Sequence, residues 1–466
     1  MPPSSPKTHQ TSSKPGLIGW ALFDWATQPF YTLVVTFLFA PYFVNGFMDD
    51  PTHGQTLWAY TTGTAQLIAA MLAPVLGAIA DAGLPRKPWI AGFSVLLVLG
   101  LSGLWFAVPG DLSLVPLVLL SFGLATIGAE LATVFNNAMM PDLVPRTRLG
   151  TLSGAGWATG YVGGLVSLAI VAGLIVTDPN TGQTLFGLEP LFVLDTAARE
   201  GDRLVGPFSA LWYFVFVLPL FLFTPDRQDK VPGPGVVRAG LQRLVGSVRD
   251  LLRNHRNVAL FLLARMLYAD GLGAVFAFGG IYAASVFGWG AAELGLFGIV
   301  LTLAGTISAG FGGVLDDRAG SRTVIVVALL FFITGSIGVL SVDPDEILFF
   351  VSVAPKADGS GLFASAGERA YLAFAILIGL SAGPIQASSR TLLARICPPG
   401  KTTEFFGFFA FSGKITAFAA PLAIGVVTAI SDSQRLGISA SLAFLVGGLL
   451  LLLWVRAPRA GTRHAP

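Results

Sequence analysis

Two loops of this sequence share a pattern of glycine, aspartate and basic residues. The first reads Gly77-Ala-Ile-Ala-Asp81-Ala-Gly-Leu-Pro-Arg86-Lys87, and the second reads Gly313-Val-Leu-Asp-Asp317-Arg318-Ala-Gly320-Ser-Arg322. In both loops a glycine stands four residues before an aspartate, and Gly77 and Gly313 are 236 residues apart, close to half of the chain. Such spacing predicts an internal repeat of two related halves.

The residue types in these loops suit a contact that can form and release. Glycine lets a neighbouring helix approach closely, and the aspartate can accept hydrogen bonds from a helix N-terminus or pair with an arginine there. We therefore expect the loops to clamp one side of the protein in one conformation. The expected gating residues are Gly77, Asp81, Arg86, Lys87, Gly313, Asp317, Arg318, Gly320 and Arg322.

The rest of the chain is strongly apolar. Of 466 residues, 54% are hydrophobic and only 12% are charged, about half the usual share of a soluble protein. A bilayer core needs about 20 apolar residues per helix. The apolar runs predict an all-α integral membrane protein of about twelve transmembrane helices in two six-helix halves. The predicted spans are 17–46, 56–80, 88–109, 113–140, 149–177, 207–224, 257–287, 291–315, 323–342, 371–396, 404–430 and 435–455.

Basic residues give these spans a direction. With both termini in the cytosol, the inside segments hold 21 of the 28 Lys and Arg residues and the outside segments hold five. This asymmetry is typical of the positive-inside rule and favours an even number of spans in the cytoplasmic membrane. The predicted organisation is a cytosolic tail (1–16), an N-terminal half (17–224), a cytosolic linker (225–256), a C-terminal half (257–455) and a second tail (456–466). Within the linker, apolar residues recur at helical spacing, so it is either an amphipathic helix on the membrane surface or a solvated connection.

Several function classes find no support in the composition. The net charge of +2 does not favour nucleic-acid binding, and one cysteine with four scattered histidines does not favour a metal site. We find no catalytic constellation and no nucleotide-binding loop, so we expect neither an enzyme nor a cofactor. We expect a monomer whose partners are a small solute and membrane lipids.

The second loop resembles the loop signature of the major facilitator superfamily, Gly-x-Leu-x-Asp-Arg-x-Gly-x-Arg/Lys. The first loop departs from it, because Ala82 stands in place of the arginine and Leu84-Pro85 displaces the second glycine. A clamp in the N-terminal half would then depend on Arg86 or Lys87.

Longer stretches are similar to one branch of that superfamily, the bacterial permeases related to the fungal autophagy-linked vacuolar amino-acid effluxer. The resemblance lies in Trp20-Ala-Leu-Phe-Asp24-Trp25, Phe135-Asn136-Asn137-Ala-Met-Met-Pro141, Ala264-Arg265-Met-Leu-Tyr268-Ala-Asp270, Gln386-Ala-Ser-Ser-Arg390, Glu404-Phe-Phe-Gly-Phe and Ser412-Gly-Lys414. It implies the major facilitator fold, alternating access and efflux of an amino acid or related solute.

Charged residues inside the predicted spans are the candidates for function. A charge at the bilayer centre costs roughly 2.5–3.5 kcal/mol on insertion scales, so such groups usually face a cavity or a partner. Counted from the span ends, Glu130, Asp270 and Lys414 lie near the midplane, and Asp24, Arg265 and Arg390 lie nearer the cytosol. The candidates for binding a solute or proton are Asp24, Gln28, Glu130, Asn137, Arg265, Asp270, Gln386, Arg390 and Lys414.

These charges can also be interpreted as pairs that hold helices together, which leaves two functions open. The first is a secondary transporter for a small polar or zwitterionic solute, in which Glu130 and Asp270 could couple transport to a proton gradient. The alternative is a membrane sensor or lipid-handling scaffold that transports nothing. A glycine-rich stretch, Gly156-Trp-Ala-Thr-Gly160-Tyr161-Val-Gly163-Gly164, resembles an antiporter signature, although close helix packing explains it more simply.

Overall fold

The chain forms two compact, almost entirely helical units. The computed structural model describes residues 11–82, 84–177, 182–185, 187–226, 246, 249–357 and 361–457. Unit 1 consists of Met1–Leu152, Thr159–Leu244 and Pro399–Gly407, and unit 2 consists of Ser153–Ala158, Val245–Pro398 and Phe408–Pro466. The predicted boundaries of the linker stay predictions, because residues 227–245, 247 and 248 lie outside the described part of the chain.

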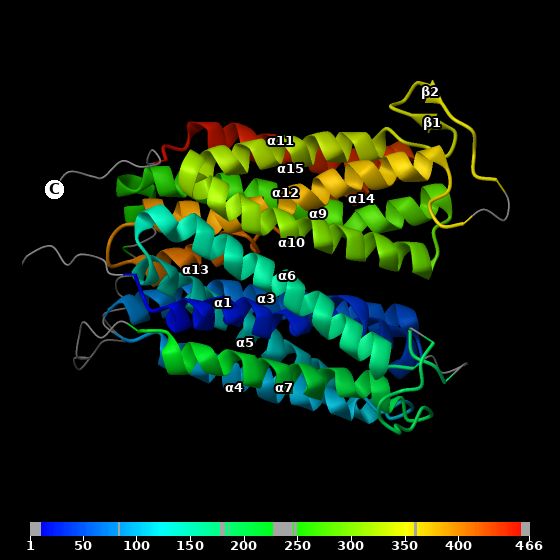
Figure 1. Ribbon diagram of the computed structural model, residues 1–466, viewed down its shortest axis with the longest axis horizontal. Helices are drawn as coiled ribbons and strands as arrows, with labels where there is room; N and C mark the ends of the chain where they lie inside the picture. Colours follow the sequence, from blue (N-terminus) through cyan, green and yellow to red (C-terminus); the bar gives the residue numbers. More distant parts are fainter. Residues whose placement is uncertain are drawn as a thin grey trace, which may run out of the picture. The chain divides into compact units, whose positions relative to one another are not determined.

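Unit 1 is built from long apolar helices that lie side by side (Figure 1). Its first span is irregular, because two π-helical stretches, Phe30–Phe37 and Phe43–Phe47, flank the short helix α2 (Phe39–Tyr42). The other helices are α1 (Lys14–Pro29), α3 (Pro51–Asp81), α4 (Lys87–Gly103), α5 (Val115–Leu143), most of α6 (Leu149–Leu174), α7 (Glu200–Phe223) and the start of α13 (Thr402–Ser412). Short 3-10 turns lie at Leu104–Phe106, Leu112–Leu114 and Arg146–Arg148.

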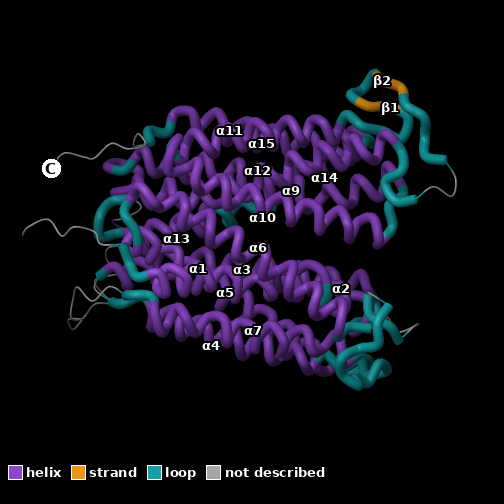
Figure 2. The backbone as a smooth tube through the Cα atoms, in the orientation of Figure 1, coloured by secondary structure: helices purple, strands orange, loops and turns teal. Residues whose placement is uncertain are grey.

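Unit 2 has a similar set of helices and one small hairpin. Its helices are α9 (Arg256–Phe287), α10 (Ala291–Ala319), α11 (Ser321–Leu340), α12 (Ala366–Ile396), α14 (Ala419–Ser431) and α15 (Gln434–Trp454). The antiparallel strands β1 (Glu346–Ile347) and β2 (Val351–Ser352) follow α11 and are the orange parts of the tube in Figure 2. The hairpin thus belongs to the loop 343–370, which is predicted to lie on the side of the membrane away from the cytosol.

The two units pair their helices in the same order. In unit 1, α4 packs on α5 and α7, α1 packs on α7, and α3 packs on α5. In unit 2, α11 packs on α12 and α15, α9 packs on α15, and α10 packs on α12. Each of these contacts in unit 2 joins two spans that come six positions later in the chain than the two spans of the matching contact in unit 1. The repeat suggested by two short loops therefore extends through the packing of both units.

The predicted spans agree closely with the helices. Eleven helices in the described part of the chain are long and apolar enough to cross a membrane. Most ends differ by only a few residues, and the largest difference is at α7, which begins at Glu200 rather than at residue 207. The structure therefore confirms the all-α membrane architecture expected from hydropathy.

The prediction of one continuous helix over 404–430 is wrong. The segment is divided into α13 and α14 by a turn over residues 413–418. Pro421 has no N–H to bond the carbonyl of Ala417, and the ring of a proline collides with the carbonyl four residues before it. Within the turn, Ala417 N donates to Lys414 O and Ala419 N donates to Thr416 O. These shorter bonds replace the helical ones, and hydropathy does not detect such a change because the segment as a whole remains apolar.

Candidate functional site

The first repeated loop packs against the start of α13 within unit 1. Asp81, the last residue of α3, accepts a hydrogen bond of 2.9 Å from the backbone N–H of Glu404. Four residues earlier, a Cβ on Gly77 would lie 2.5 Å from the carbonyl oxygen of Thr403, so only glycine fits there. Since free N–H groups at a helix N-terminus attract negative charge, Asp81 holds α13 by its end.

Arg86 and Lys87, which follow in the same loop, bond to further parts of unit 1. The buried Arg86 guanidinium donates from Nη1 to Asp142 Oδ2 at 2.5 Å and from Nε to Thr403 Oγ1 at 3.0 Å. Lys87 Nζ donates to the carbonyl of Phe221 at 3.0 Å, which ties the start of α4 to the end of α7. The superfamily signature has an arginine directly after the aspartate, where this chain has Ala82. Arg86 therefore supplies the positive charge that is missing there.

The second loop uses a different partner. Arg395 of α12 donates to both carboxylates at the end of α10, at 2.6 Å to Asp316 Oδ1 and 2.8 Å to Asp317 Oδ1. Gly320 has a φ of +88°, a conformation that other residues rarely adopt, and it ends α10 before α11 begins. Arg318 is exposed, and Arg322 donates to the carbonyls of Leu452 and Leu453 at the end of α15.

Among the candidates inside the spans, Asp24 and Gln28 face the glycine-rich part of α6. A Cβ on Gly160 would lie 3.3 Å from Asp24 Cβ, and a Cβ on Gly164 would lie 2.8 Å from Gln28 Cγ. Asp24 and Gln28 are both half-buried. The contacts show that this stripe brings two helices close together, as the simpler interpretation of the antiporter-like stretch predicted.

Glu130 lies on α5 beside an aromatic residue that the sequence analysis missed. The hydroxyl of Tyr31, in the first π-helical stretch, donates to Glu130 Oε1 at 3.5 Å. Tyr31 carries no charge, so its position opposite Glu130 could not be read from hydropathy. Asn137, two turns along α5, is half-buried next to Asn136, whose carbonyl accepts a hydrogen bond of 2.8 Å from Trp20 Nε1.

In unit 2, Arg265 joins α9 to the end of α13. Its Nη1 donates to the carbonyl of Phe409 at 2.7 Å and to Ser412 Oγ at 3.3 Å, and its guanidinium carbon lies 3.5 Å from the centre of the Phe409 ring. A Cβ on Gly413 would lie 2.5 Å from the same nitrogen. A cation is favourable at the C-terminal end of a helix, so Arg265 stabilises α13 where the helix ends.

Asp270 differs from every other candidate, because both of its carboxylate oxygens are buried without a hydrogen-bond partner in the described structure. The Thr416 hydroxyl of the turn approaches it, but not with the geometry of a hydrogen bond, and Thr416 Oγ1 is also buried without a partner. Arg265, five residues earlier on α9, acts on Asp270 only at longer range. The two do not form an ion pair, as their spacing around the helix predicted.

The remaining candidates of unit 2 lie on α12 and in the turn. Arg390 is buried and donates to Ser153, at 2.9 Å to Oγ and 2.7 Å to the carbonyl oxygen. Gln386, one turn earlier, is half-buried, and so is Lys414. Arg390 therefore holds two helices together, whereas Lys414 lies within the interruption between α13 and α14.

Candidates in the two units occupy matching positions in the repeated helices. Asp24 is the eleventh residue of α1 and Arg265 is the tenth of α9. Gly160 is the twelfth residue from the start of α6, and Gly413 is the twelfth from the start of α13. In each unit a glycine of the fifth span thus packs against a charged residue of the first span, with opposite charge in the two units.

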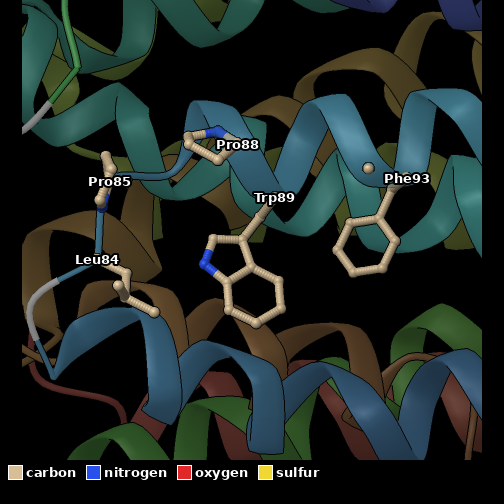
Figure 3. A pocket seen from close by; sticks show the side chains of 6 residues that line it. Leu84, Pro85, Pro88, Trp89 and Phe93 are labelled. Atoms are coloured by element: carbon tan, nitrogen blue, oxygen red, sulfur yellow. The ribbon is translucent and has the colours of Figure 1, made fainter. Parts of the chain in front are cut away.

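Not every hollow in unit 1 suits a polar solute. A pocket of about 600 Å³ at the start of α4 is drawn in Figure 3. It is lined by Leu84, Pro85, Pro88, Trp89, Gly92 and Phe93. None of these residues is charged, so the lining of this pocket is apolar.

Comparisons with known proteins agree with this architecture. A family profile described as "Vacuole effluxer Atg22 like" matches residues 44–465. The "Uncharacterized MFS-type transporter YxiO" of Bacillus subtilis is 25% identical over 442 residues, which cover 94% of each chain. "Autophagy-related protein 22-1" of Neosartorya fischeri is 25% identical over 294 residues, covering 59% of this chain and 43% of the fungal protein. The chain thus spans less than half of that fungal relative.

Solved structures show the same fold at low identity. The transporter FucP in its outward conformation has a TM-score of 0.68 at 14% identity, and the match covers 95% of this chain and 99% of FucP. The proton:xylose symporter XylE has a TM-score of 0.67 at 13% identity, with 96% of each chain covered. These matches confirm the major facilitator fold and leave the solute open.

Proposed function

Because the chain belongs to the Vacuole effluxer Atg22-like family and has the major facilitator fold, we propose that it is a secondary transporter of a small polar or zwitterionic solute. Transporters of this fold alternate between conformations open to either side of the membrane. The chain would lie in the cytoplasmic membrane with both termini in the cytosol, where the positive-inside rule puts its basic loops.

The observation that carries the proposal is the position of charged residues in the repeat. Ionisable groups inside membrane helices are rare and usually mark a transport path. Here Asp24 and Glu130 of unit 1, and Lys414 of unit 2, are half-buried rather than sealed in the protein. Groups of both signs suit a zwitterion, so an amino acid or a related compound is the first solute to test.

The repeated loops support the proposal in a second way. Asp81 and Arg86 hold the start of α13, and Arg395 holds the end of α10. All of these contacts are polar and lie at helix ends, so they can break without exposing apolar core. We assign them the role of gates that stabilise one transport conformation.

The test begins with a thermal-shift screen of amino acids and related solutes, followed by flux measurements in proteoliposomes. We expect flux of at least one hit to increase with a proton gradient, because we propose Glu130 and Asp270 as the groups that carry a proton. Glu130→Gln and Asp270→Asn together should remove the effect of the gradient, whereas Glu346→Gln in the exposed hairpin should not. Flux that ignores both the gradient and the double variant would refute the coupling. A complete absence of flux would favour a sensor or lipid-handling scaffold.

A further inference from the structure

The interruption between α13 and α14 leaves backbone oxygens without their helical donors. Ala417 N donates to Lys414 O rather than to the carbonyl of Gly413, and Ala419 N donates to Thr416 O rather than to that of Ile415. The carbonyl of Ala417 loses its donor as well, because residue 421 is proline. Three alternate carbonyls of one turn are therefore released from helical hydrogen bonds.

A buried carboxylate lies beside this turn. Asp270 is only 4% exposed and neither of its oxygens has a hydrogen-bond partner in the described structure. Thr416 Oγ1, which approaches it from the turn, is the second buried oxygen without a partner. An unpaired buried polar group destabilises the folded protein, and a charged one does so more strongly. A ligand held between the two groups would satisfy both.

From this arrangement we infer a binding site for a sodium ion, formed by the Asp270 carboxylate, the Thr416 hydroxyl and the released carbonyl oxygens of the 413–418 turn. All of these ligands are oxygens, the donors that hard cations prefer. Unwound backbone in broken membrane helices is a known way to coordinate such ions. Within the described residues no group of three or more His, Cys, Asp or Glu side chains could hold a metal ion, so a monovalent cation fits better than a divalent one.

Positive charge near Asp270 restricts the charge of the cation that can bind there. Arg265 is the charged side chain that acts on Asp270, but its guanidinium is turned toward the Phe409 carbonyl and ring. The partial negative charge at the end of α13 offsets part of the arginine charge. Lys414 adds a second positive charge within the turn itself, so an ion of single charge fits Asp270 better than a divalent one, and a sodium ion and a proton would compete for it.

The site belongs to unit 2 alone, and the inference depends on the proposed transport only where it makes sodium a coupling ion. Binding can therefore be measured without flux. The purified full-length protein is titrated with NaCl at mildly alkaline pH, with choline chloride keeping the ionic strength constant. We expect the unfolding temperature to rise and saturate with NaCl, and to rise much less with KCl.

Three variants make the test specific. Asp270→Asn and Thr416→Val should weaken the binding of radioactive sodium by about tenfold or more, since changes around an ion site commonly cost that much affinity. Thr302→Val is the matched control, because the Thr302 hydroxyl bonds the Gly298 carbonyl of its own helix. If Asp270→Asn does not fold, competition between sodium and protons on the unchanged protein gives the same information, with acidification expected to displace sodium.

The outcomes separate the two proposals. Sodium binding that is lost in both site variants supports the site even if no solute is transported. Flux without any sodium binding overturns the site and leaves the transport proposal standing. A response to NaCl that persists in Asp270→Asn, or that KCl or choline reproduces, also overturns it.

Discussion

At the scale of single residues, the charged groups inside the spans have different surroundings. Arg265 and Arg390 donate to oxygens of other helices, as interhelical clamps do. Asp270 has two buried oxygens that accept no hydrogen bond in the described structure. The sequence could not assign these partners, because hydropathy records that a charge is present but not which atoms face it.

Gly413 offers a test of the Arg265 clamp. In Gly413→Ala the new methyl group would collide with Arg265 Nη1, so the guanidinium must leave the Phe409 carbonyl. We expect the free energy of unfolding to fall by about 1–3 kcal/mol, the usual cost of overpacking, as measured by thermal or denaturant unfolding in detergent. Gly425→Ala, where a methyl group meets nothing within 4 Å, should leave stability nearly unchanged. Equal effects of the two changes would contradict the clamp.

At the scale of elements, the fifth span of each half shows how the repeat diverged. In unit 1, α6 continues from Leu149 to Leu174, and its glycines pack against α1. In unit 2 the equivalent segment is α13, a turn and α14. Proline alone does not explain the difference, since α3, α5, α7 and α12 each contain an internal proline and remain continuous. The break forms where Pro421, Gly413 and the Arg265 contact act on the same segment.

Pro421→Ala should lengthen the helix. The new N–H can bond the Ala417 carbonyl, and loss of the ring removes a clash worth about 3 kcal/mol in a helix interior. We expect the amide hydrogens of residues 414–420 to exchange at least about tenfold more slowly, as each 1.4 kcal/mol of added protection gives a factor of ten. Hydrogen exchange with mass spectrometry reads this directly. Pro207→Ala within the continuous α7 is the control and should not alter exchange at 414–420.

At the scale of the whole molecule, consecutive helices are joined alternately by loops predicted to lie in the cytosol and loops predicted to lie outside the cell. The basic loop at 318–322 lies at one end of α11, and the hairpin of β1 and β2 lies beyond its other end (Figure 1). The hairpin tip is apolar, and Phe350 is 78% exposed. The positive-inside rule assigns the basic end to the cytosol, so the hairpin should face the outside.

Cysteine labelling tests this orientation. The chain has one cysteine, the buried Cys397, which can be replaced by serine. In that background we expect a membrane-impermeant maleimide to label Phe350→Cys in intact cells and Arg318→Cys only after permeabilisation. The reverse pattern would invert the topology. Labelling of both sites from one side would contradict their positions at opposite ends of α11.

Hydropathy and residue spacing were enough to predict the repeat, the short list of charges and every span except the interrupted one over 404–430. Each follows from the solvent: a bilayer requires long apolar helices with satisfied backbones, and it makes every internal charge conspicuous. These constraints act on each segment separately, so composition and spacing are enough to read them. The family resemblance, confirmed by the profile over residues 44–465, added the fold.

Which charges act as clamps, where the eleventh span breaks and what lies opposite Asp270 depend on the packing of distant helices. Arg86 takes the place of a missing arginine because α13, more than three hundred residues later, brings Thr403 to it. Tyr31 meets Glu130 because α5 packs beside the first span. Such contacts depend on how distant helices are rotated and spaced, and in a chain with so few polar groups many arrangements bury apolar surface equally well. The local pattern therefore predicts that a charge needs a partner, and packing alone selects which partner it has.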